Sequence, residues 1–343
     1  MIMKFSLMVA AAVLLHACSP GAEKSAPMPS APTALPAAAP KRAKAVHFNT
    51  PEADAILSSL QVFPKDNPWN EDISERPVHP DSDKIIDSVG RNLRFRWNHD
   101  MSFIVVPPDQ PKVPVQFDYA AESDPGPYPI PDDAPLEGWP LTGVPLEKMQ
   151  REGGGDRHIL MVDPAAKKLY ELFYTFRTEK GWKAGSGAIF DLSSNALRPD
   201  GWTSGDAAGL PIFPGVVRYA ECERGMVEHA LRVTIKKTRR AYVYPATHQA
   251  SSHTDVSLPR MGDRFRLKKD FDVSRFPPHI QAILKGLKKY GMIVADNGIE
   301  WAVSISPDVR IKGLETLDHK AVKGNDFELI VPTGPNEGPR AKK

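Results

Sequence analysis

The chain has 343 residues, of which 41% are hydrophobic and 25% are charged, and its formal net charge is +2 at pH 7. This length and composition allow one large hydrophobic core or two small ones. A net charge so close to zero argues against nucleic-acid binding, which usually requires a strong basic excess in one region. The sequence also has no P-loop and no G-x-G-x-x-G pattern, so no nucleotide ligand is expected.

The amino-terminal residues have the pattern of a bacterial lipoprotein signal. A lysine at position 4 precedes an apolar run from Phe5 to Leu15, and a small residue stands before Cys18. Lipoprotein signal peptidases require this arrangement, because the cysteine becomes the new amino terminus and carries palmitate-type acyl chains. An ordinary secretory signal or a short transmembrane helix are the alternatives, but the run is too short to span a bilayer. We expect residues 1–18 to direct the protein to the outer membrane, since Ser19 resembles the sorting signal.

The rest of the chain divides by composition. Residues 19–46 are mostly Ala, Pro, Ser and Lys, which cannot bury enough surface to offset chain entropy, so a disordered tether is expected. Residues 47–333 are expected to form a single globular domain, and residues 334–343 a disordered basic tail. Cys222 has no disulfide partner once Cys18 is acylated, and its acidic neighbours disfavour a thiolate, so a structural role is expected.

Three helices are predicted. The first begins at Thr50-Pro51, where a capping residue precedes a proline suited to the first helical position. The second covers Ser82–Val89, and the third begins at Pro277-Pro278 and ends at Gly291 with apolar residues at helical spacing. Between these helices, residues 107–145 are too rich in proline for a helix or a central strand. We expect an extended wrapping segment that docks through Phe117, Tyr119, Tyr128, Ile130 and Trp139.

Short runs of β-branched and aromatic residues predict strands through most of the domain. They lie at residues 158–162, 168–176, 188–192, 227–235, 241–244, 265–267, 292–295, 299–305 and 327–331. Strands outnumber helices without a regular βαβ alternation. The predicted fold is therefore mainly β, a jelly-roll-like antiparallel β-sandwich with one packed amphipathic helix and the proline-rich wrapping segment.

Two long motifs carry a family resemblance. The sequences GAIFDLSSNALRPDGWTS at residues 187–204 and KYGMIVADNG at residues 289–298 resemble an uncharacterised family of secreted bacterial proteins and lipoproteins. The likeness extends over residues 78–331 and implies a secreted setting and one domain. It implies no catalytic residue.

The candidate catalytic residues lie in or beside the long connection at residues 192–216. Asp191, Asp200 and Asp206 are candidate catalytic carboxylates, and Trp202 is a candidate stacking surface for a sugar ring. His158 and Asp296 are further candidates for substrate binding. The alternative is purely structural, because Asp and Gly are common turn formers, a tryptophan can anchor a core, and buried polar groups can be satisfied by the backbone.

A metal site is a weaker prediction. His248, His253 and Asp255 follow a predicted strand closely, and an inward-facing His229 could add a fourth ligand. Their spacing matches no standard zinc signature, and the sequence requires no cofactor.

The combined hypothesis is an outer-membrane lipoprotein, attached to the membrane through Cys18, whose β-rich domain binds or processes an envelope or extracellular polysaccharide. If it is an enzyme, glycoside hydrolysis is the expected reaction. The alternative is a non-catalytic structural or interaction lipoprotein of the cell envelope.

Overall fold

The computed structural model describes residues 43–317 and 322–340, which belong to one compact unit. The predicted signal with Cys18, and the predicted tether as far as residue 42, lie outside the described residues. Among the residues described, no helix combines the length and the apolar composition needed to cross a membrane.

The described residues contain fourteen β-strands in three sheets and five α-helices, so the unit is mixed α/β. The helices are α1 (Pro51–Ser59), α2 (Ser82–Val89), α3 (Leu146–Arg151), α4 (Tyr219–Glu223) and α5 (Pro278–Lys289). The first seven strands are β1 (Val46–His47), β2 (Arg96–His99), β3 (Ile104–Val105), β4 (Val115–Phe117), β5 (Ile159–Asp163), β6 (Lys168–Phe173) and β7 (Phe176–Thr178). The others are β8 (Gly181–Ala184), β9 (Ser186–Asp191), β10 (Leu231–Thr234), β11 (Arg264–Leu267), β12 (Met292–Asp296), β13 (Ala302–Ile305) and β14 (Phe327–Leu329).

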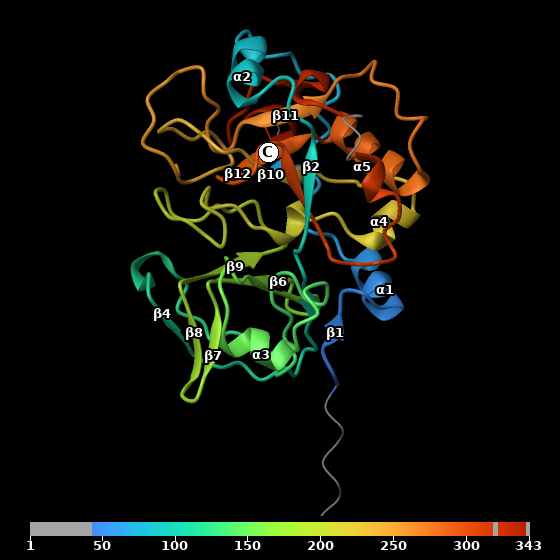
Figure 1. Ribbon diagram of the computed structural model, residues 1–343. Helices are drawn as coiled ribbons and strands as arrows, with labels where there is room; N and C mark the ends of the chain where they lie inside the picture. The colour runs from blue at the N-terminus through green and yellow to red at the C-terminus, as the bar shows by residue number, and fades with distance from the viewer. Residues whose placement is uncertain (1–42, 318–321, 341–343) are drawn as a thin grey trace, which may run out of the picture. The chain divides into compact units, whose positions relative to one another are not determined.

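The five-stranded sheet, in the order β1-β3-β5-β6-β9, is covered on both faces (Figure 1). Alternate residues of β5 point to opposite faces, as strand geometry requires. Leu160 and Val162 join the large hydrophobic core, whereas Ile159 and Met161 join a smaller core with Tyr128 of the proline-rich segment. The three-stranded sheet, in the order β4-β8-β7, contributes Ala184 to this smaller core.

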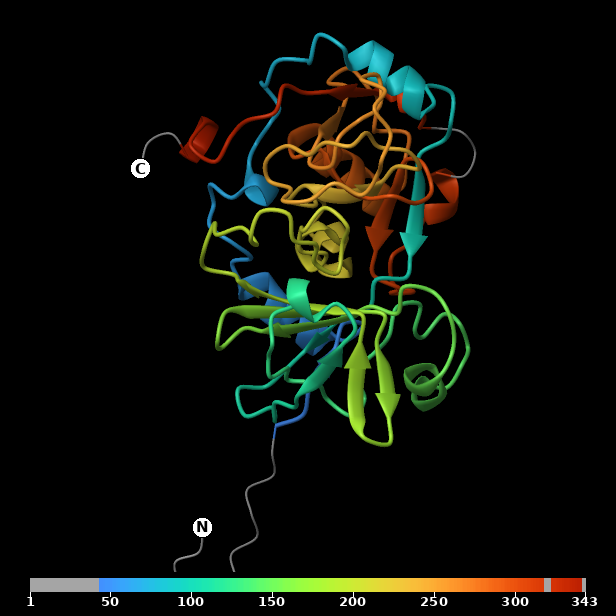
Figure 2. The same cartoon turned by 90° about the vertical axis from the view of Figure 1, so that its left-hand side faces the viewer.

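The six-stranded sheet has the order β14-β11-β12-β10-β13-β2 and packs with α5 around the large core. Figures 1 and 2 both place the connection at residues 192–216 between this sheet and the five-stranded sheet. A backbone contact confirms that position, because the Ile212 amide donates to the Glu171 carboxylate on β6 at 2.9 Å. The two larger sheets therefore meet at this connection.

The antiparallel sandwich is not confirmed. Parallel strand pairs occur in all three sheets, namely β3–β5, β4–β8, β10–β12 and β13–β2. The sequence missed this because the partners of each parallel pair are far apart in the chain, and short apolar runs do not reveal the direction of their partner.

The three predicted helices are confirmed as α1, α2 and α5, and the Thr50 side chain caps α1 by accepting from the Ala53 amide at 3.3 Å. Two short helices, α3 and α4, were not predicted. The proline-rich segment docks as expected through Tyr128 and Ile130, which are buried, whereas Tyr119 is exposed. Its strand β4 lies at a sheet edge, where proline neighbours are tolerated.

The described part of the predicted tail ends at Arg340. Residues 335–339 are exposed, whereas Arg340 is buried. Its guanidinium donates to the Glu71 carboxylate at 3.1 Å and to the Asp66 carbonyl at 2.9 Å. A specific ion pair with a buried acid therefore attaches the end of this segment to the rest of the unit.

Leu284→Asp is expected to destabilise the unit by several kcal/mol, because Leu284 is fully buried on α5 and an unpaired carboxylate there has no partner. Lys285→Asp on the exposed face of the same helix is the control, with an expected change of about 0.5 kcal/mol or less. Urea unfolding of both variants measures the difference, and equal midpoints would contradict the packing of α5.

Candidate functional site

Two adjoining pockets of about 490 and 410 Å³ lie between the two larger sheets and have Asp156, Asp296 and Asn297 as shared lining residues. We call the space that they form the acidic cleft. Its acidic lining residues are Asp100, Glu122, Glu137, Asp156, Asp206 and Asp296, and Arg157, His158 and Arg232 also line it. Six acids and two arginines therefore line one confined space.

Six separate stretches of chain supply these side chains. Asp100 follows β2, Glu137 belongs to the proline-rich segment, and Asp156 and His158 precede β5. Asp206 lies in the connection at residues 192–216, Arg232 is on β10, and Asp296 is the last residue of β12. The cleft therefore exists only when both larger sheets are folded and docked.

A strained turn presents Asp156 and His158. Arg157, between them, has a positive φ of 55°, a conformation that costs a non-glycine residue energy. Its buried guanidinium donates to the carbonyls of Thr175 at 3.0 Å and Glu152 at 2.9 Å and stacks 3.9 Å from the Phe176 ring. These bonds tie the turn to α3 and β7, so Arg157 positions its two neighbours.

A buried ion pair forms the base of the cleft. Arg232 is 3% exposed and Asp206 is 1% exposed. Arg232 binds both carboxylate oxygens of Asp206, with Nε to Oδ2 at 2.9 Å, and also donates to the Ser304 hydroxyl at 2.6 Å. Such a bidentate pair loses several kcal/mol when one partner is removed, because the other charge stays buried. Asp206 therefore acts as the counter-ion of Arg232.

Burial raises the pKa of three other acids of the cleft. Burial, followed by repulsion from Glu137, raises the pKa of Asp100 to about 7. Burial, followed by repulsion from Asp206, raises the pKa of Asp296 to about 7, and burial also raises the pKa of Glu137. Carboxyl groups with such pKa values can donate a proton near neutral pH, which makes them candidates for general acids.

Two further groups lie at the back of the cleft. Burial lowers the pKa of His158 to about 4, so its ring is neutral at physiological pH. Burial also raises the pKa of Glu171 to about 8, although its carboxylate accepts from the Ile212 and Phe213 amides at 2.9 Å. Gly205 lies beside both, since a Cβ there would come 3.6 Å from His158 Nδ1 and 3.8 Å from Glu171 Oε2.

Glu137, Asp156 and His158 come closest together. Each of them offers one ligand atom, and these atoms lie within 4.8 Å of one another. The Glu137 and His158 backbones also bond, with the Glu137 amide donating to the His158 carbonyl at 3.0 Å. Among the described residues, no other set of three His, Cys, Asp or Glu side chains comes this close.

The structure brings together three of the residues that the sequence singled out, because Asp206, His158 and Asp296 all line the acidic cleft. It places Asp191, Asp200 and Trp202 outside it. Asp191 pairs with Lys168 at 2.9 Å, Asp200 accepts from the Tyr242 hydroxyl at 2.6 Å, and the Trp202 ring stacks against Arg198. These three residues stabilise the connection, whereas its residues 203–207 line the cleft.

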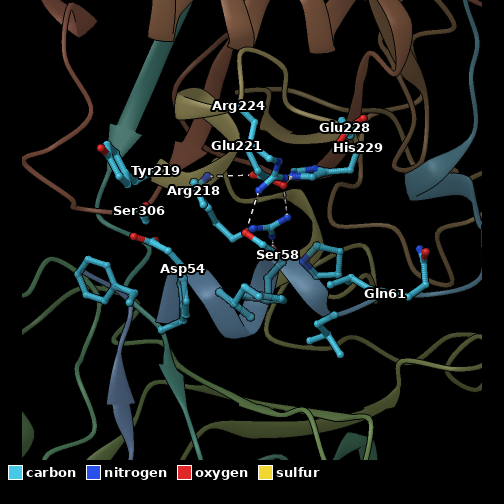
Figure 3. A pocket seen from close by; sticks show the side chains of 18 of the residues that line it. Asp54, Ser58, Gln61, Arg218, Tyr219, Glu221, Arg224, Glu228, His229 and Ser306 are labelled. Atoms are coloured by element: carbon cyan, nitrogen blue, oxygen red, sulfur yellow. Dashed lines mark hydrogen bonds and ion pairs between the residues drawn. The ribbon is translucent and has the colours of Figure 1, made fainter. Parts of the chain in front are cut away.

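His229 belongs to a different pocket, of about 410 Å³, beside α1 and α4 (Figure 3). There His229 Nε2 lies 3.2 Å from the Glu221 carboxylate, which Arg218 also binds. Burial alone would raise the pKa of Glu221, but the charges of Arg218 and His229 lower it to about 2. Glu221, Arg218 and His229 satisfy one another. Neighbouring Cys222 is buried, and burial raises its thiol pKa, in agreement with the structural role expected from the sequence.

The predicted metal ligands do not assemble. His248 Nδ1 lies 2.9 Å from the Ala207 carbonyl, and His253 is exposed. The Asp255 carboxylate accepts from the Ser257 amide at 2.9 Å. Within the described ranges, no group of three possible ligands includes any of these residues or His229.

Sequence reasoning missed Asp100, Glu137, Asp156 and Arg232 as members of one site. A signal was available for Asp156, because it belongs to an Asp-Arg-His sequence directly before a strand. Arg232 alternates with apolar residues on β10, a pattern that predicts a solvent-exposed face, yet Arg232 is buried against Asp206 of the connection.

Searches against protein-family models, curated proteins and solved structures find no match for this chain.

Asp296→Asn is expected to raise stability at pH 8 in EDTA-containing buffer. The folded pKa of Asp296, about 7, lies above the ordinary aspartate pKa of 3.8, so the folded state holds the proton more tightly and loses stability as pH rises from about 4 to 7. Removing this ionisation recovers up to ~4 kcal/mol, at 1.36 kcal/mol for each pKa unit.

Urea unfolding between pH 4 and pH 8 tests this expectation, with the exposed Asp200→Asn as the control. The gain should fall below about 1 kcal/mol at pH 4, where Asp296 is protonated in the folded state and about half protonated in the unfolded state. A gain that does not depend on pH, or a loss at pH 8, would contradict the raised pKa.

Proposed function

We propose that this protein is an envelope lipoprotein whose acidic cleft binds and hydrolyses a polysaccharide. The observation that carries the proposal is the presence of two different carboxyl groups, Asp296 and Asp156, in both pockets of one cleft. Asp296 is half-buried beside Arg232 and Asp206, whereas Asp156 is exposed. Hydrolysis of a glycosidic bond needs two carboxyl groups, one that donates a proton and one that accepts a proton.

The proposed reaction assigns one role to each carboxyl group. Asp296 donates its proton to the oxygen of the leaving sugar as the glycosidic C–O bond breaks. Asp156 accepts a proton from the water molecule whose oxygen bonds to the anomeric carbon. Proton transfer from Asp156 back to Asp296 through solvent restores both groups, so the net change is the addition of one water to the bond.

The rest of the cleft suits a sugar polymer. Its two pockets together give room for more than one sugar ring, and both are open to solvent on the side of Asp156. Tyr119, which is 61% exposed, and Phe173 line one pocket and offer aromatic faces for stacking. Asn98, Asn297 and Thr203 line the cleft as hydrogen-bonding groups for sugar hydroxyls. Tyr119 therefore replaces Trp202 as the candidate stacking residue.

Incubation of the full chain with a panel of purified capsular, cell-wall and exopolysaccharides, followed by reducing-end analysis, tests the proposal. Asp296→Asn and Asp156→Asn should each lower turnover by at least about 100-fold, the scale of losing a general acid or base. Asp200→Asn, an exposed aspartate outside the cleft, should retain full turnover.

Binding separates the two functions considered for the cleft. Tyr119→Ala should weaken glycan binding by about 1 kcal/mol, since one aromatic stacking surface is lost. Binding without any product would support a non-catalytic envelope protein. Absence of both binding and product across the panel, with the fold intact by circular dichroism, would contradict the proposal.

The membrane attachment rests on Cys18 and the apolar run before it. Cys18→Ser should release the protein from the membrane fraction, because acyl chains provide stable anchoring and the Ala- and Pro-rich segment that follows offers no apolar face. Membrane fractionation with immunoblotting measures this. Outer-membrane recovery of the unaltered chain is expected, and unchanged membrane association of the variant would contradict lipid anchoring.

A further inference from the structure

We propose that Glu137, Asp156 and His158 form a binding site for one divalent transition-metal cation, Zn²⁺ or Mn²⁺. The inference deepens the proposed function, on which it rests for its chemical use, since the cation would lie at the same cleft.

The spacing of the three ligand atoms suits a single cation. They lie within 4.8 Å of one another. Ligand atoms about 2.0 to 2.2 Å from one cation are separated by about 3 to 4 Å, so closure requires a side-chain movement of about 1 Å. Asp156 is exposed and supplies that freedom, whereas the backbone bond between Glu137 and His158 fixes the other two residues relative to each other.

The donor atoms select the class of cation. One imidazole nitrogen and two carboxylate oxygens make a mixed set that suits Zn²⁺ and Mn²⁺. Ca²⁺ and Mg²⁺ prefer sites built from oxygen alone. Three protein ligands also leave coordination positions for water, as in catalytic rather than structural zinc sites.

An independent observation comes from the His158 ring. The residue is 3% exposed, and its Nδ1 is a buried atom without a hydrogen-bond partner among the described residues. An unsatisfied buried polar atom of this kind costs roughly 1 to 3 kcal/mol. Asp100 lines the same pocket, and its Oδ1 is also a buried atom without a partner in the described part of the chain. The trio includes one ring nitrogen of His158, and coordination at Nδ1 would give that nitrogen a partner.

The charges around the trio favour a cation as well. Arg157 and Arg232 are the cations that line this cleft. Arg157 donates to backbone carbonyls, and both Asp206 oxygens bind Arg232. Asp100, Glu137, Asp156 and Asp296 therefore share a space in which no lysine is a lining residue. A charge of +2 placed between Glu137 and Asp156 would reduce the repulsion among these four acids.

The proposed function gives this cation a use. A cation bound to one oxygen of Asp156 would lower the pKa of the water that the proposed reaction places beside that carboxylate. The second oxygen of Asp156 would remain available to accept the proton. Asp296 is not one of the three ligands and stays the proton donor of the proposed reaction, although the nearby positive charge would lower its pKa.

Isothermal titration of the EDTA-treated full chain with ZnCl₂, and electron paramagnetic resonance with MnCl₂, test the site directly. We expect one cation for each chain. Asp156→Asn and Glu137→Gln should each weaken binding by at least about tenfold, as loss of a ligand requires. Asp255→Asn, the same substitution at an exposed aspartate outside the trio, is the matched control and should bind as the unaltered chain does.

Asp156→Asn is the more informative of the two variants, because an exposed side chain can be replaced without loss of the fold. Circular dichroism checks that the variant is folded. The inference is overturned if the unaltered chain binds neither cation, or if Asp156→Asn and Glu137→Gln both bind as tightly as it does. Glycan hydrolysis that persists in EDTA would overturn the inference and leave the proposed function standing. Cation binding at the trio without activity on any glycan would support the inference and count against the proposed function.

Discussion

The bidentate pair between Arg232 and Asp206 is the interaction on which the acidic cleft depends. It joins β10 of the six-stranded sheet to the connection at residues 192–216, which in turn contacts Glu171 on the five-stranded sheet. Both partners are almost completely buried, so neither charge can be satisfied by water. The pair also sets the electrostatics around it, because the Arg232 charge lowers the pKa of Asp100, Glu137 and Asp296 while burial raises each of them. Without this arginine, the acids could ionise only at higher pH.

A second constraint acts on the opposite side of the cleft. The backbone at Arg157 and Tyr174 has positive φ values of 55° and 53°, and the Tyr174 amide donates to the Asp156 carbonyl at 2.7 Å. This hydrogen bond, made beside the ends of β5 and β6, holds the Asp156 backbone in place. The Arg157 guanidinium donates to backbone carbonyls rather than to an acid, and these hydrogen bonds offset part of that strain. Strain of this kind persists only where surrounding structure fixes it, and it is common at functional sites.

Local sequence patterns predicted the helices well and the sheets less well. α2 and α5 follow from apolar residues at helical spacing, and α1 from a capping threonine before a proline, all within one short segment. The parallel pairs of the sheets join strands such as β2 and β13, which are separated by most of the chain. No local pattern specifies such partners, so the sequence indicated strands but not the mixed sheets that they form.

The same limit applies to the cleft. His158, Asp206 and Asp296 could be singled out as polar residues in unusual places, but their meeting depends on the docking of two sheets. Arg232 alternates with apolar residues along β10, and such alternation normally separates a buried face from a hydrated one. Here both faces of β10 are buried, and the polar one lines the cleft. The polar face of an alternating strand can therefore be exposed to water, or it can be covered by other parts of the chain and line a site.

The acids of the cleft lower the stability of the folded state, so a structural role alone does not explain them. Asp100 and Asp296, each with a pKa of about 7, lower the stability of the folded state as pH rises above about 4. Asparagine at either position would keep most of the shape and remove that cost. A purely structural polar core would be expected to resemble the Glu221, Arg218 and His229 group, in which opposite charges satisfy one another. The contrast between these two clusters, one paired and one with an excess of acids around an open space, is the strongest physical argument that the acidic cleft acts on a ligand.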